Sequence, residues 1–168
     1  YTGSADGLIH VTKDGGSTWA DIAEGLPEDM WVSRVQASAF VEGRVYAVLN
    51  GYRWDDFTPY VYRSEDYGAT WERIGTDLPM EPANVIKEDP KNEHIIYVGT
   101  DHGLYVSLDR GDSFMLMDNG LPATPVHDVV IHPRENDIIV GTHGRSIYLV
   151  RGTELQMLNA DLLATTLH

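Results

Sequence analysis

The sequence of 168 residues contains no cysteine, which excludes disulfide bonds and metal sites built from thiolates. It also has no apolar run of about 18 residues, so we expect no insertion into a membrane. Basic residues are few: 12 lysines and arginines stand against 26 aspartates and glutamates, for a formal net charge of −14. Because such a chain is repelled by phosphate backbones, we expect no nucleic-acid partner. This acidity fits a solvated surface, or partners that are cationic or neutral, such as glycans.

What the sequence does contain is one eight-residue pattern that occurs three times, at Thr12–Trp19, Ser64–Trp71 and Ser107–Phe114. Each copy has a hydroxyl residue, an aspartate, a glycine, a second hydroxyl residue and a final aromatic residue. Glycine takes a positive φ in a tight turn without steric cost, and aspartate accepts hydrogen bonds from backbone N–H groups inside that turn. The ring is expected to start the next strand and to be buried. The pattern therefore predicts a β-hairpin turn within an internal repeat.

The residues to which this structural role is assigned are Asp14, Gly16, Trp19, Asp66, Gly68, Trp71, Asp109, Gly111 and Phe114. A catalytic or calcium-binding role for the three aspartates is the alternative. Calcium takes about 6–8 oxygen ligands, and no dense acidic loop supplies them. Local hydrogen bonds to the backbone account for all three copies, so the structural role is favoured.

This pattern resembles the Asp-box, or BNR repeat, of sialidases, sortilin-type (VPS10) receptors and several bacterial glycoside hydrolases. In those families the motif lies on β-propeller blades, between the third and fourth strands. The resemblance implies an all-β fold of four-stranded antiparallel blades and extends over nearly the whole chain. His132-Pro133 and Asp137–Tyr148 also resemble the last propeller blade of bacterial sortilin-like or BNR-repeat proteins. The Asp-box motif indicates a fold and does not indicate one particular function.

The spacing of the repeat predicts one four-stranded unit per copy. Asp66 and Asp109 lie 43 residues apart, and Asp14 and Asp66 lie 52 apart, an excess that matches an insertion at 50–59. Propeller blades repeat at roughly 40–50 residues. We therefore expect a partial blade at 1–30, a blade with that insertion at 31–82, a blade at 83–122, a shortened last blade at 123–158 and a short C-terminal helix or linker at 159–168.

The two ends of the chain carry further expectations. Tyr1–Ile9 is similar to Tyr97–Tyr105, but the apolar strand that precedes the later copy is almost entirely missing from the first. In the last blade, Glu154–Leu158 is expected to supply the fourth strand. Because a propeller closes a ring of about 4–8 blades, we expect an arc of a larger propeller, with the remaining blades of the same protein as neighbours.

The topology of a four-stranded blade predicts where a ligand site would lie. The first and third turns fall on one face of the disc, whereas the second turn and the blade-to-blade connections fall on the other. The Asp-box turns thus share one face, and the chemically richer segments surround the channel mouth on the opposite face. Ligand-binding candidates there are Trp31, Trp54, His102, His127, His143 and Arg145, and the carboxylates suited to acid–base work are Asp56, Glu81 and Asp101.

Each candidate has a plainer alternative. Asp55 and Asp56 suit an exposed polar insertion better than a catalytic pair, because adjacent residues on a strand point to opposite faces. The histidines are scattered, with no His-x-x-x-His pair, so we expect no metal site and no cofactor. His102 and His143 could instead hold turns beside the channel. Arg145 could clamp a ligand carboxylate or form an ion pair with a neighbouring blade. A sialidase would need three such arginines in one pocket.

Three functional hypotheses follow. The first is a ligand-binding propeller module of a secreted, periplasmic or cell-surface protein, similar to the sortilin-type family, with a peptide, a protein or a glycan as partner. The second is a polysaccharide-active glycoside hydrolase of the BNR-repeat type, which needs two carboxylates about 5–9.5 Å apart across a cleft. The third is a structural propeller that positions its neighbours. The first is favoured because these residues form no catalytic constellation.

Overall fold

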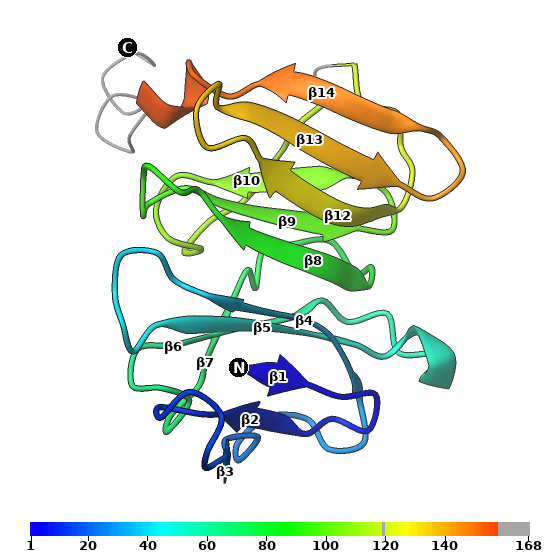
Figure 1. The fold of residues 1–168 in the computed structure, drawn as a ribbon. Helices are drawn as coiled ribbons and strands as arrows, with labels where there is room; N and C mark the ends of the chain where they lie inside the picture. The colour runs from blue at the N-terminus through cyan, green and yellow to red at the C-terminus, as the bar shows by residue number, and fades with distance from the viewer. Residues whose placement is uncertain (119, 158–168) are drawn as a thin grey trace.

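A computed structural model describes residues 1–118 and 120–157, and in this part of the chain all extended structure belongs to four antiparallel sheets. The sheets follow one another in chain order, from the blue N-terminal sheet to the orange C-terminal one (Figure 1). Each sheet is an up-and-down meander, so the predicted all-β fold of propeller blades is confirmed. None of the described helices is long and apolar enough to cross a membrane.

The blades have the following strands. Blade 1 contains β1 (Thr2–Gly3), β2 (Ile9–Val11) and β3 (Ala20–Asp21). Blade 2 contains β4 (Trp31–Ala37), β5 (Val45–Asn50), β6 (Tyr60–Ser64) and β7 (Glu72–Ile74), with the 3₁₀ helix η1 (Tyr52–Trp54) between β5 and β6. Blade 3 contains β8 (Ala83–Glu88), β9 (Ile96–Thr100), β10 (Leu104–Ser107) and β11 (Met115–Leu116). Blade 4 contains β12 (Val126–Ile131), β13 (Asp137–Thr142) and β14 (Ile147–Arg151).

One predicted strand is wrong. Glu154–Leu158 was expected to form the fourth strand of blade 4, but Leu155–Met157 forms a second 3₁₀ helix, η2. The side-chain amide of Gln156 donates to both carboxylate oxygens of Asp89, at 3.1 and 2.9 Å, and the backbone N–H of Gln156 donates to Gly152. These bonds hold the segment across the turn between β8 and β9. The helix or linker expected at 159–168 lies outside the described residues.

Among the described residues, the hydrophobic core lies between the sheets, in three clusters that each join two successive blades. Strand β5 shows why, because its side chains alternate. Ala47 and Leu49 pack towards blade 1, whereas Tyr46 and Val48 pack towards blade 3, and the whole strand is buried. Strand β14 alternates between half-buried and exposed residues, because only one face of its sheet is covered by described residues.

The three Asp-box turns have the same set of hydrogen bonds. In the first, Gly16 N donates to Thr12 Oγ1 at 2.8 Å, and the N–H and hydroxyl of Thr18 donate to the two carboxylate oxygens of Asp14 at 2.9 and 2.6 Å. The equivalent distances are 2.8, 2.8 and 2.7 Å in the second turn and 2.7, 2.9 and 2.6 Å in the third. The motif glycines have φ values of +98°, +86° and +97°, as the turn requires.

The burial predicted for the three motif aromatics differs among the copies. Trp71 and Phe114 are half-buried against the preceding blade, and the indole N–H of Trp71 donates to the carbonyl of Ile22 at 2.7 Å. Trp19 is 49% exposed, so its predicted burial is wrong. The reason is positional: the described residues contain no sheet on the side of blade 1 towards which this ring projects.

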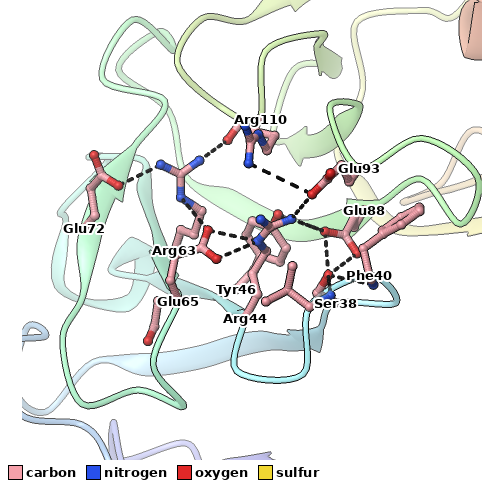
Figure 2. Close-up of polar contacts among 12 residues, drawn as sticks. Ser38, Phe40, Arg44, Tyr46, Arg63, Glu65, Glu72, Glu88, Glu93 and Arg110 are labelled. Atoms are coloured by element: carbon pink, nitrogen blue, oxygen red, sulfur yellow. Dashed lines mark hydrogen bonds and ion pairs between the residues drawn. The ribbon is translucent and has the colours of Figure 1, made fainter.

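A network of charged and polar side chains joins blades 2 and 3 through their first and third turns (Figure 2). Arg44 donates to Glu65 at 2.9 Å and to Glu93 at 2.8 Å, and it lies 3.6 Å from Glu88. Glu88 also accepts bonds from the hydroxyls of Ser38 and Tyr46, at 2.8 and 3.0 Å. The side chains of Arg44 and Glu88 are only 4% and 1% exposed, so this network is part of the interior between the two blades.

Candidate functional site

A pocket with a volume of about 320 Å³ opens between blades 2, 3 and 4, at the ends of the strands opposite to the Asp-box turns. Its lining comes from three places: the starts of β4, β8 and β12, which are the first and innermost strands of the three blades, the ends of the second strands β5, β9 and β13, and η1. The lining residues are Trp31, Asn50, Tyr52, Arg53, Asn84, Asp101, Pro125, His127 and His143.

The same two backbone positions supply most of this lining in successive blades. A register shift near the start of each innermost strand leaves one residue unpaired, which is Ser33 in blade 2, Asn84 in blade 3 and His127 in blade 4. Such a bulge turns a side chain away from the sheet, and bulges are common beside functional sites. The second position lies at the close of the second strand, at its last residue or directly after it. The pocket is therefore a product of the repeat.

The second position contributes Asn50, Asp101 and His143, one from each blade. Asn50 and Asp101 take part in a hydrogen-bonded chain at the base of the pocket. Asn50 Nδ2 donates to Asn84 Oδ1 at 2.8 Å, and Asn84 Nδ2 donates to Asp101 Oδ1 at 2.9 Å. At the other end of this hydrogen-bonded chain, the backbone N–H of Tyr52 donates to Asn50 Oδ1 at 3.0 Å. Since both asparagines are buried, these bonds fix the pocket base across blades 2 and 3.

Rings form much of the remaining wall. The imidazoles of His127 and His143 lie 5.6 Å apart, centroid to centroid, at an angle of 54°. On the opposite side, the guanidinium of Arg53 lies 5.3 Å from the centre of the Trp31 ring, at the distance of a cation–π contact. The pocket thus combines flat, apolar walls with a polar base, which is the usual character of a ligand site.

The pocket gathers some of the residues predicted from the sequence and leaves others out. Trp31, His127 and His143 line it, and so does Asp101. Trp54, at the end of η1, is 54% exposed and lies outside the lining, as do His102 and the exposed Arg145.

Glu81 and Asp56 are both engaged in local structure. Glu81 is buried and accepts bonds from Thr100 and Tyr105, both at 3.1 Å, and contacts His102 Nδ1 at 2.5 Å. Burial, with the nearby Glu81 carboxylate, raises the pKa of Tyr105 to about 12. Asp56 accepts a bond from Thr58 N at 2.9 Å, which with the Thr58 side chain lowers its pKa.

The candidates predicted from the sequence did not include Asn50, Tyr52, Arg53, Asn84 or Pro125. Two of these could have been found. Asn50 occupies the position of Asp101 and His143 at the close of the second strand. Asn84 lies five residues before Asp89-Pro90, as His127 lies five residues before His132-Pro133, so aligning the repeats in the sequence would have included both. Tyr52 and Arg53 belong to an insertion without a counterpart in the other blades, and no repeat argument reaches them. Within residues 1–118 and 120–157, no group of three histidine, aspartate or glutamate side chains is placed to hold a metal ion.

Comparisons with known proteins agree with this architecture. The family model Sortilin-Vps10, described as sortilin, neurotensin receptor 3, matches residues 59–157. A vacuolar protein sorting/targeting protein 10 from Laccaria bicolor is 31% identical over 106 residues, which is 60% of this chain and 6% of that protein. The chain thus spans a small part of the curated relative that it matches.

Two solved structures share the fold. One is the GH74 xyloglucanase from Xanthomonas campestris, with 16% identity, a TM-score of 0.66, and coverage of 84% of this chain and 23% of the enzyme. The other is YCF48 bound to a D1 peptide, with 15% identity, a TM-score of 0.55, and coverage of 87% of this chain and 59% of YCF48. At these identities the likeness concerns the blades and their arrangement.

Proposed function

The chain belongs to the Sortilin-Vps10 family, and from this premise we propose that it is a ligand-binding propeller module that binds a peptide segment in the pocket between blades 2, 3 and 4. The observation that carries the proposal is the convergence of equivalent positions. Asn50, Asp101 and His143 from three successive blades all line one pocket. A purely structural propeller has no need for such a polar, ring-lined hollow at its mouth.

The chemistry of the lining favours a peptide. Trp31, Pro125 and the paired imidazoles offer flat surfaces for an apolar or aromatic side chain, and the amide chain at the base offers hydrogen-bonding groups. A volume of about 320 Å³ suits one or two side chains of a longer ligand. YCF48, which has the same fold, is bound to a peptide in its solved structure.

The family also bears on where the module works. The relative from Laccaria bicolor is named for vacuolar protein sorting and targeting. We place this module in a secreted, periplasmic or cell-surface protein, with the remaining blades of that protein as its structural neighbours. If the ligand is instead a protein or a glycan, we expect it to bind in the same pocket.

The test is peptide binding by the intact protein. We expect an immobilised library of short peptides to retain it, and we expect Trp31→Ala and His127→Ala each to weaken binding at least about tenfold, as losses at interface centres do. His94→Ala is the matched control for His127→Ala, because His94 is an exposed histidine in the turn before β9, on the face opposite to the pocket. Thermal unfolding of each variant separates lost binding from lost folding. Full binding by both pocket variants would overturn the proposal.

A glycoside hydrolase remains the second candidate, since the xyloglucanase shares the fold. Hydrolysis needs two carboxylates across a cleft, and of the described residues lining the pocket Asp101 is the one carboxylate. Xyloglucan incubated with the intact protein should therefore stay intact. Release of reducing sugar that is abolished by Asp101→Asn would favour the hydrolase instead.

A further inference from the structure

We propose that the pocket recognises a cationic side chain of its ligand, a lysine or an arginine, which takes the place beside Trp31 now held by Arg53 and is neutralised by Asp101. The inference rests on the proposed function and names the chemical class of ligand for the same pocket. Two features of the lining carry it: the direction of the hydrogen-bonded chain that ends at Asp101, and the guanidinium of Arg53 that lies over the Trp31 ring. The charge balance of the lining follows from these same two residues.

The hydrogen-bonded chain has a fixed direction because a carboxylate can only accept. Asp101 Oδ1 therefore requires the amide nitrogen of Asn84, at 2.9 Å, to point towards it. The oxygen of Asn84 must then face Asn50, whose nitrogen donates to it and also to the carbonyl of Ala83 at 3.2 Å. The chain starts at the backbone N–H of Tyr52 and ends at a carboxylate.

This direction determines what the base of the pocket offers. Asp101 Oδ2 accepts no hydrogen bond from any described residue, and it belongs to a side chain that lines the pocket. A free carboxylate oxygen at the end of the chain suits a ligand that donates, and a charged donor makes the strongest such bond. A ligand carboxylate at the same place would be repelled.

The Trp31 ring already holds a cation. Arg53 lies with its guanidinium 5.3 Å from the ring centre, and it forms no ion pair with a described residue. It belongs to η1, a short exposed helix whose neighbouring side chains Tyr52 and Trp54 are 59% and 54% exposed. An exposed arginine without a carboxylate partner is readily displaced, whereas a ligand cation would gain both the ring and Asp101.

The charges of the pocket lining favour the replacement of Arg53 by a cation of the ligand. Arg53 and Asp101 are the only lysine, arginine, aspartate or glutamate side chains among the described residues lining the pocket, so their formal charges cancel. When Arg53 swings out, the lining keeps the negative charge of Asp101. The whole chain, with its formal charge of −14, also attracts cations and repels anions over longer distances.

The experiment uses the peptides retained by the intact protein, each resynthesised in three forms at its basic position: arginine, citrulline and glutamate. Citrulline keeps the shape of arginine without its charge. We expect the arginine forms to bind at least about tenfold more tightly than the citrulline forms, and the glutamate forms to bind more weakly still. A higher salt concentration should reduce the difference in affinity between the arginine and citrulline forms, because it screens the charge of the ligand.

Two variants then locate the effect. Asp101→Asn should remove the preference for arginine over citrulline, while keeping an oxygen that can accept from Asn84. Arg53→Ala should strengthen binding of the arginine forms several-fold, because the ring is vacated. The matched controls are Asp112→Asn and Arg134→Ala, both exposed and on the opposite face, which should change neither quantity.

The outcomes separate the two proposals. If the library retains no peptide, the proposed function itself fails. If peptides bind equally well in all three forms, peptide binding stands and the cationic preference is wrong. If the glutamate forms bind best and Arg53→Ala weakens them, Arg53 is a receptor for anions and the inference is overturned.

Discussion

Tyr46 and Tyr97 occupy equivalent positions on β5 and β9, and both are completely buried between blades, yet their hydroxyls differ. Tyr46 donates to Glu88 at 3.0 Å, whereas the hydroxyl of Tyr97 has no hydrogen-bond partner among the described residues. The matching bulges of β8 and β12 place Ile131 at the position of Glu88 in the next blade. The tyrosine hydroxyl at this repeat position therefore has a hydrogen-bond partner in blade 2 and has none among the described residues in blade 3.

This difference predicts opposite effects of the same substitution. A buried hydroxyl without a partner costs about 1–3 kcal/mol, so Tyr97→Phe should raise the free energy of unfolding by about 1 kcal/mol. Tyr46→Phe should lower it by about 1.5–3 kcal/mol, because it removes a hydrogen bond to a charged group. Urea unfolding at constant m-value measures both. Equal destabilisation by the two variants would show that the Tyr97 hydroxyl is satisfied after all.

Turns and strands whose determinants are local could be predicted from the sequence. The Asp-box hydrogen bonds run within eight residues, from Thr12 to Trp19 in the first copy, so the motif carries its own turn. The pocket depends on contacts far apart in sequence, such as that between Asn50 and Asn84, and on register shifts that no single strand encodes. Topology was enough to propose Trp31 and His127. It also placed the insertion at 50–59 on this face, but it could not tell that Arg53 lines the pocket and that Trp54 does not.

The Asp-box turns also predict a dependence on pH. The hydroxyl and backbone N–H of Thr18 lower the pKa of Asp14 to about 2, and the backbone and hydroxyl of Thr70 lower that of Asp66. Since the unfolded value is about 3.9, the ionised carboxylates stabilise the fold fully above pH ~4. This contribution should be lost as the pH falls towards 2. Carbon-detected NMR titration of the aspartates, with the melting temperature over the same range, measures the effect.

Thr18→Val is the control for that measurement. It removes one of the donors to Asp14 and keeps the size of the side chain, so the pKa of Asp14 should move back towards its ordinary value. The titration of Asp66, in another blade, should not change. An Asp14 that titrates near pH 4 in the folded wild-type protein would contradict the proposed hydrogen bonds.

Blades 2 and 3 are joined on both faces and through their shared hydrophobic cluster. The amide chain links them at the pocket and the Arg44 network links them at the Asp-box turns (Figure 2). Blades 2 and 4 meet through the ion pair of Arg34 and Asp128, which lies between the innermost strands β4 and β12 at 2.6 Å. These two ionic connections differ in burial, and burial should decide their contributions to stability.

Replacing each arginine by methionine tests this difference. Arg44→Met leaves Glu88 buried with an uncompensated charge and should lower the free energy of unfolding by about 3–5 kcal/mol. Arg34→Met breaks a shorter ion pair, but its side chains are 36% and 54% exposed, so the loss should stay below about 1 kcal/mol. Urea denaturation of the intact protein measures both variants. If Arg34→Met lowers the free energy of unfolding as much as Arg44→Met does, the N–O distance of the ion pair, and not its burial, would determine its contribution to stability.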